Sequence, residues 1–213
     1  MARKRLSKKI MSRKAIIKLI NQYTKTDKKK YPLSPNSLTN DDIYKASRIL
    51  FTKNITMGLQ TKKFEKDFAK FLGAKYALMV NSGSSANLLA LFTLTNPAKE
   101  NKLTTGDECL IPALCWSTSL WPIVQAGLKP RFVDVDPLTL NLSIKDLKKK
   151  INKKTKAIML VHVLGNSTNM DELNSIVKKK KLYLIEDTCE SLGSKYKNKY
   201  LGTFGNFGTF SFS

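Results

Sequence analysis

Residues 76–94 read YALMVNSGSSANLLALFTL, and this run indicates the type of fold. An apolar segment of strand length, residues 76–80, comes first. A turn of small residues follows, and residues 87–94 then form an apolar segment that suits a helix. Strand, turn and helix in this order are the repeating part of an α/β protein.

The same succession recurs along the chain. Strands are expected at residues 109–111, 131–135, 157–163 and 182–187. Helices are expected at residues 60–72, 117–125, 144–151 and 170–180. Short, almost wholly apolar strands are typical of a parallel sheet that is buried on both faces. The sequence therefore predicts an α/β fold with a mainly parallel sheet flanked by helices.

The charge of the chain is unevenly distributed. The 213 residues include 38 Lys and Arg against 16 Asp and Glu, a net charge of +22. Twelve of the basic residues and one acidic residue fall within the first 30 positions, which marks residues 1–40 as a basic N-terminal arm. Only five basic residues are Arg, the side chain that surfaces reading nucleic acid favour. We expect no specific nucleic-acid partner, and a basic nucleic-acid- or membrane-binding protein is the alternative of another class.

The cysteines and the single histidine, His162, show no metal-ligand spacing. We therefore expect no metal and reduced thiols. The basic N-terminus lacks the apolar core of a secretory signal, and no apolar run reaches the ~18 residues of a transmembrane helix. A cytoplasmic protein without a transmembrane segment is expected.

The turn SGSS, residues 82–85, has the features of a phosphate site. Free backbone N–H groups and the positive end of the helix dipole attract an anion there. The alternative is that Ser84 or Ser85 only caps the helix. The turn matches neither a Walker loop nor a dinucleotide fingerprint, so a smaller phosphate-bearing cofactor fits better.

Three further residues follow predicted strands. Asp187 could hold a heteroaromatic nitrogen protonated, as pyridoxal phosphate (PLP) enzymes require, or it could be a helix cap or an ion-pair partner. Trp116 could stack on an aromatic cofactor, although composition favours core packing beside Trp121. For His162 a hydrogen-bonded residue at a strand end is favoured over a catalytic one.

Five segments together resemble the DegT/DnrJ/StrS family of sugar aminotransferases, in the family's order and spacing. They are VNSGSSANLLAL, IPALCWSTSLWPIVQAGLKPRFVDVD, HVLGN, IEDTCESLGSKY and LGTFGNFGTFSFS. The resemblance implies a PLP-dependent transferase of fold type I. Residues 41–213 would be its large, PLP-binding domain, and full-length members of the family usually act as homodimers.

The resemblance also implies which residues bind the cofactor, either PLP or its pyridoxamine form (PMP). From phosphate to ring they are Gly83, Ser84, Ser85, Ser211, Trp116, Asp187 and Glu190. Ser211 would be a second phosphate ligand, and Trp116 would stack on the pyridine ring. Asp187 would pair with the ring nitrogen, and Glu190 stands where many members carry Gln near the ring hydroxyl.

The catalytic residue is unknown, because the family places it a few residues after the equivalent of Ser211, just beyond Ser213. A Lys there forms the Schiff base with PLP. The enzyme then transfers an amino group from a donor such as glutamate to a nucleotide-linked keto-sugar, for polysaccharide, lipopolysaccharide or deoxysugar biosynthesis. A subgroup carries His instead and, with PMP, removes the 3-hydroxyl of a 4-keto-6-deoxy nucleotide sugar.

The wording SGSSANLLAL, where SGTAAL is commoner, leans toward this 3-dehydratase subgroup. The C-terminal small domain of the family also has no counterpart within the 213 residues. We therefore expect a truncated large domain that is inactive, or nearly so, by itself.

Overall fold

The computed structural model describes residues 12–23, 38–53 and 55–212. The chain forms two compact units, Met1–Lys63 and Phe64–Ser213. In the first unit α1 (Arg13–Tyr23) contacts α2 (Asn40–Thr52), and Arg13 pairs with Asp41 at 2.6 Å. Much of the expected basic arm, residues 1–40, lies outside the described residues.

The second unit has the alternation that the sequence predicts. After α3 (Leu59–Leu72), which starts in the first unit, its elements are α4 (Gly83–Thr95), β1 (Glu108–Pro112), α5 (Ser117–Gln125), β2 (Lys129–Val133), α6 (Ile144–Lys150), β3 (Thr155–Val161), the 3-10 turn η1 (Val163–Gly165), α7 (Met170–Lys180), β4 (Tyr183–Asp187), β5 (Lys195–Tyr196), β6 (Lys199–Tyr200) and β7 (Phe207–Thr209). The main sheet has the order β2-β1-β3-β4-β7, and every pair in it is parallel. The predicted α/β class is confirmed.

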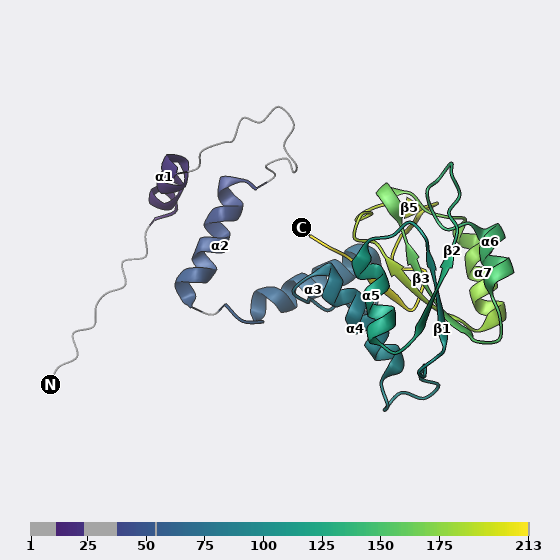
Figure 1. The fold of residues 1–213 in the computed structure, drawn as a ribbon. Coiled ribbons are helices and arrows are strands. Elements are labelled where there is room, and N and C mark those ends of the chain that lie inside the picture. The colour runs from purple at the N-terminus through teal and green to yellow at the C-terminus, as the bar shows by residue number, and fades with distance from the viewer. Residues whose placement is uncertain (1–11, 24–37, 54, 213) are drawn as a thin grey trace. The chain divides into compact units, whose positions relative to one another are not determined.

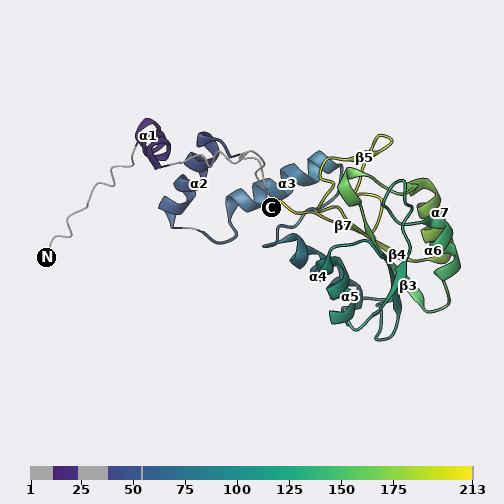
Figure 2. The same ribbon diagram turned by 45° about the horizontal axis from the view of Figure 1, so that its top comes forward.

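Helices cover both faces of this sheet, α4 and α5 on one and α6 and α7 on the other (Figures 1 and 2). Side chains alternate along each strand, so each strand supplies both halves of the core. In β3, Met159 packs in the half that contains Leu91 of α4. Its neighbours Ile158 and Leu160 pack in the half that contains Leu173 of α7. The alternation also decides to which face of the sheet each polar side chain at the strand ends points.

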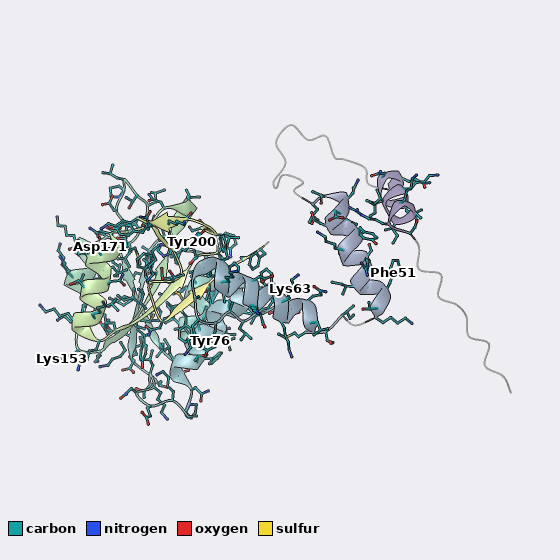
Figure 3. All side chains as sticks on the ribbon, turned by 180° about the vertical axis from the view of Figure 1, so that it is seen from behind. Phe51, Lys63, Tyr76, Lys153, Asp171 and Tyr200 are labelled. Carbon is teal, nitrogen blue, oxygen red and sulfur yellow. The ribbon has the colours of Figure 1, made fainter. Side chains whose placement is uncertain are left out.

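The strand expected at residues 76–80 is absent from the structure, so that prediction is wrong. A strand forms only by hydrogen bonding to a neighbour, and these residues have none. They line a groove of about 1170 Å³ together with residues of β7, the last strand of the sheet on that side. Tyr76, labelled in Figure 3, is 78% exposed there, and Leu78 is exposed as well. The apolar pattern of a strand is present without a partner strand beside it.

The other strand boundaries differ by a few residues. The strand expected at 131–135 is β2, which ends at Val133. It lies at the edge of the sheet and is only partly buried, unlike β1, β3 and β4. Edge position explains the exposure, because a second strand covers only one of its sides.

Candidate functional site

A cavity of about 340 Å³ lies where β3, β4 and β7 end at their carboxyl sides. Its lining residues are Ser82, Gly83, Ser84, Trp116, Thr118, Ser119, Val161, Asp187, Cys189, Glu190 and Ser211. Ligands of open α/β sheets bind at this edge. Of the seven residues that the sequence suggested as cofactor ligands, the cavity brings six together, and Ser85 is the exception.

The cap of α4 differs from the expected one. Ser82 has extended backbone angles, and its hydroxyl oxygen accepts a hydrogen bond from the Ser85 amide at 3.1 Å. Ser82 is therefore the N-cap, not Ser84 or Ser85, and the Ser85 side chain lies against Ser82. The amides that open a helix have no partner within it. Those of Gly83 and Ser84 belong to residues that line the cavity.

Asp187 ends β4 on the α4 and α5 side of the sheet and is 4% exposed. Its Oδ2 accepts hydrogen bonds from Asn87 Nδ2 and from Ser119 Oγ, both at 2.7 Å. Its Oδ1 accepts one longer bond, from the Cys189 amide at 3.1 Å. A buried carboxylate is tolerated when it is hydrogen-bonded in this way. Oδ1 retains most of the free acceptor capacity.

Trp116 is the residue before α5 and forms part of the cavity wall. It is 68% exposed, and Trp121 is exposed as well, so the expectation that the pair fills the core is wrong. The buried side of α5 consists of smaller residues, Ser119, Pro122 and Ile123. An exposed tryptophan on a cavity wall is available for stacking.

Glu190 also lines the cavity and is exposed. Its Oε2 accepts a hydrogen bond from the amide of Leu164, at 3.2 Å. Leu164 has φ of +53°, an uncommon angle for leucine, within the turn η1 that follows β3. Glu190 therefore ties that turn to the cavity.

The thiols beside Asp187 are held in the neutral form. Burial, and after it the charge of Asp187, raises the pKa of Cys115 above the usual value. Burial, the charge of Asp187, a side-chain hydrogen bond to Asp187 and the charge of Glu190 raise the pKa of Cys189. Cys109 lies in the core, where burial raises its pKa to about 12. These cysteines are free and poorly suited to act as nucleophiles.

Gly83 leaves space that the cavity needs. A Cβ at this position would lie 2.7 Å from Cys189 Sγ and 3.1 Å from Ser211 Cβ. We expect Gly83→Ala to lower the free energy of unfolding by about 1–3 kcal/mol through overpacking, measured by urea denaturation. Removing the sulfur with Cys189→Ala in the same chain should recover part of the loss. Equal stability of wild type and Gly83→Ala would contradict this close packing.

Two buried residues behind the cavity were not singled out as a pair by the sequence. Glu186 and His162 are both 0% exposed, and His162 Nε2 donates to Glu186 Oε2 at 2.9 Å. Glu186 also accepts from three backbone amides of the turn before β7, those of Gly202, Phe204 and Gly205. Nδ1 of His162 is the one buried side-chain polar atom without a partner within the described part of the chain. The expected hydrogen-bonded role of His162 is confirmed.

Asn87 and Ser119 were also missed as parts of the site. Asn87 is the only polar residue in the apolar run 86–92, a signal that could have been followed. Its partner Asp187 is 100 positions away, and no local pattern reports such a pairing.

The residues fit a small phosphate-bearing heteroaromatic cofactor. The cavity combines helix-start amides, hydroxyls, an exposed indole and a carboxylate with a free acceptor position. The missing side chain of Gly83 lets Cys189 and Ser211 pack close to the start of α4. Phosphate, ring face and protonated ring nitrogen each need one of these groups.

Two other kinds of site were sought in residues 12–23, 38–53 and 55–212. No three His, Cys, Asp or Glu side chains there gather as metal ligands would. Within the same ranges no helix has the length and apolar character needed to cross a bilayer.

Comparison with known proteins gives a consistent result. Residues 36–213 match the model of the DegT/DnrJ/EryC1/StrS aminotransferase family. GDP-4-keto-6-deoxy-D-mannose 3-dehydratase from Escherichia coli O55:H7 is 48% identical over 183 residues, which are 85% of this chain and 46% of that enzyme. GDP-perosamine synthase from Escherichia coli O157:H7 is 41% identical over 155 residues, 73% of this chain and 41% of that enzyme.

The solved structures agree. The E. coli GDP-4-keto-6-deoxy-D-mannose-3-dehydratase with bound hydrated PLP superposes with a TM-score of 0.81 at 44% identity. The match covers 85% of this chain and 46% of that structure. The chain thus spans about half the length of the relatives it matches.

Proposed function

The chain belongs to the DegT/DnrJ/EryC1/StrS aminotransferase family, and on this premise we propose that it binds PLP or PMP as part of an enzyme acting on nucleotide-linked keto-sugars. One observation carries the proposal: six of the seven expected cofactor ligands line a single cavity. Residues 41–213 are proposed as the cofactor-binding large domain.

Each lining residue has a proposed task. The amides of Gly83 and Ser84, with Ser211, bind the phosphate at the start of α4. Trp116 covers one face of the ring, and Asp187 Oδ1 accepts a hydrogen bond from the protonated ring nitrogen. When bound, the cofactor supplies an electron sink for bonds broken on the sugar. Glu190 is proposed to lie near the ring hydroxyl, and Ser85 to act through the cap of α4.

We propose the 3-dehydratase reaction as the closer fit. The E. coli dehydratase is more similar than the perosamine synthase, 48% against 41% identical, and the SGSSANLLAL wording favours the same side. The substrate would be a 4-keto-6-deoxy nucleotide sugar, PMP the working cofactor and glutamate the amino donor. Amino transfer to the keto-sugar is the second candidate, which the 41% identity to a perosamine synthase supports.

A second copy of the chain is proposed as partner. The apolar residues of helix α4 are not confined to one side, although only one side can face the core. Leu89 and Phe92 of α4 are exposed, as are Trp121 and Val124 of α5, the helix packed against it. An apolar surface of this kind next to a site is typical of an oligomer interface. A homodimer would cover it.

The test uses the protein as the cell makes it. Given PLP, glutamate and GDP-4-keto-6-deoxymannose, we expect mass spectrometry to show a sugar that has lost its 3-hydroxyl oxygen and kept the 4-keto group. A product that has gained an amino nitrogen would establish the aminotransferase instead. If neither product forms and PMP does not bind, the proposed function is wrong.

A further inference from the structure

Asn87, in the first turns of α4, is a polar side chain in an unusual place. It is 1% exposed and lies in a helix whose other residues are mostly apolar. Asparagine is seldom fully buried unless both ends of its amide are used. Here both are used: Nδ2 donates to Asp187 Oδ2 at 2.7 Å, and Oδ1 accepts from Thr209 Oγ1 at 2.6 Å. Nδ2 also lies 3.3 Å from the carbonyl oxygen of Thr118.

The partners fix which way the amide points. A carboxylate only accepts hydrogen bonds, so the NH₂ group of Asn87 must face Asp187. The carbonyl end then faces Thr209, whose hydroxyl donates to it. Thr209 itself is held opposite Asp187 by the pairing of β4 and β7. The hydrogen bonds from Thr209 to Asn87 and from Asn87 to Asp187 therefore run in one fixed direction.

These hydrogen bonds determine which oxygen of Asp187 is occupied and which is available to a ligand. Asn87 and Ser119 both donate to Oδ2, each at 2.7 Å. Two short bonds from different helices to one oxygen stop the carboxylate from rotating. Oδ1, whose bond from the Cys189 amide is longer at 3.1 Å, is left as the better acceptor for a ligand in the cavity.

We infer that Asn87 is a positioning residue, which aims Oδ1 of Asp187 at the ring nitrogen of the bound cofactor. The inference rests on the proposed function, because it presumes PLP or PMP in the cavity. Asn87 does not touch the cofactor cavity itself and acts through Asp187. It occupies the position where the wording SGTAAL has Leu, which cannot donate.

The test measures binding of PMP to the protein as the cell makes it, since PMP needs no covalent link. Equilibrium dialysis gives the dissociation constant, and NMR of PMP labelled with ¹⁵N in the ring reports whether the ring nitrogen is protonated. In Asn87→Leu we expect about 10-fold weaker binding, the worth of a hydrogen bond to a charged group, and a ¹⁵N signal shifted toward the unprotonated ring.

Two more variants separate aiming from packing. Asn87→Asp keeps the size of the side chain but places a second carboxylate against Asp187, so it should weaken binding more than Asn87→Leu. Thr209→Val removes only the group that orients the amide and should shift both readouts in the same direction by less. It also serves if Asn87→Leu fails to fold. Thr93→Val is the matched control, because its hydroxyl bonds only to Leu89 O within α4.

The outcomes are distinct. Failure of the wild-type chain to bind PMP would refute the proposed function, and this inference with it. If the wild type binds PMP but the ¹⁵N signal is unchanged in both Asn87→Leu and Thr209→Val, the inference alone is overturned. A larger dissociation constant with an unchanged ¹⁵N signal would also overturn it, because Asn87 would then only support the packing of α4.

Discussion

Asp187→Asn is expected to weaken PMP binding about 100-fold, the largest effect on binding of any single change in the cavity. Asn87 and Ser119 both donate toward Oδ2, so the new amide must leave its oxygen there. Its NH₂ group then takes the place of Oδ1, facing the Cys189 amide and the cofactor nitrogen. Two donors would meet where an acceptor is required. Equilibrium dialysis and the ring ¹⁵N signal measure the loss.

The control for this change is Asp171→Asn. Asp171, labelled in Figure 3, lies in α7 on the opposite face of the sheet and pairs with Lys197 at the surface. We expect PMP binding within twofold of wild type there. If Asp187→Asn also bound PMP as wild type does, Asp187 would not be the partner of the ring nitrogen.

Glu186→Ala is expected to cause the largest loss of stability, about 3–5 kcal/mol in the free energy of unfolding. The change leaves His162 and the three amides of Gly202, Phe204 and Gly205 without their common acceptor. All of these groups lie in or against the core, where an unsatisfied donor is costly. Urea denaturation followed by circular dichroism measures the difference.

Two variants serve as comparisons for Glu186→Ala. Glu186→Gln keeps the shape and one acceptor oxygen, so it should lose less, about 1–3 kcal/mol. Glu172→Ala removes an exposed glutamate that pairs with Lys148, and it should cost at most about 1 kcal/mol. Equal losses in Glu186→Ala and Glu172→Ala would show that the turn before β7 does not depend on Glu186.

Local patterns account for the parts of the fold that the sequence predicts. Ser143 predicts the start of the helix at 144–151, and its side chain caps α6. The apolar runs of β3 and β4 are buried as expected. In each case the signal and the structure it reports lie within a few residues of one another.

The failures have the opposite character. Residues 76–80 have the composition of a strand, but whether a strand forms depends on a neighbour far away in the chain. The bonds of Asn87 reach Asp187 and Thr209, 100 and 122 positions later. Trp116 is exposed, while smaller residues of α5 occupy the buried positions. Pairings of this kind become visible only once the chain has folded.

Adjacent residues of β4 carry the two carboxylates on opposite faces of the sheet, Asp187 toward the cavity and Glu186 toward the turn before β7. A strand alternates faces at every residue, so a shift of one position would turn each carboxylate to the opposite face. β4 therefore tolerates substitution better than insertion or deletion. A single codon lost within it before Glu186 would put the shorter acid where the longer one is needed and Thr188 in the place of Asp187, and would disable binding and folding together without changing the chemical character of any side chain.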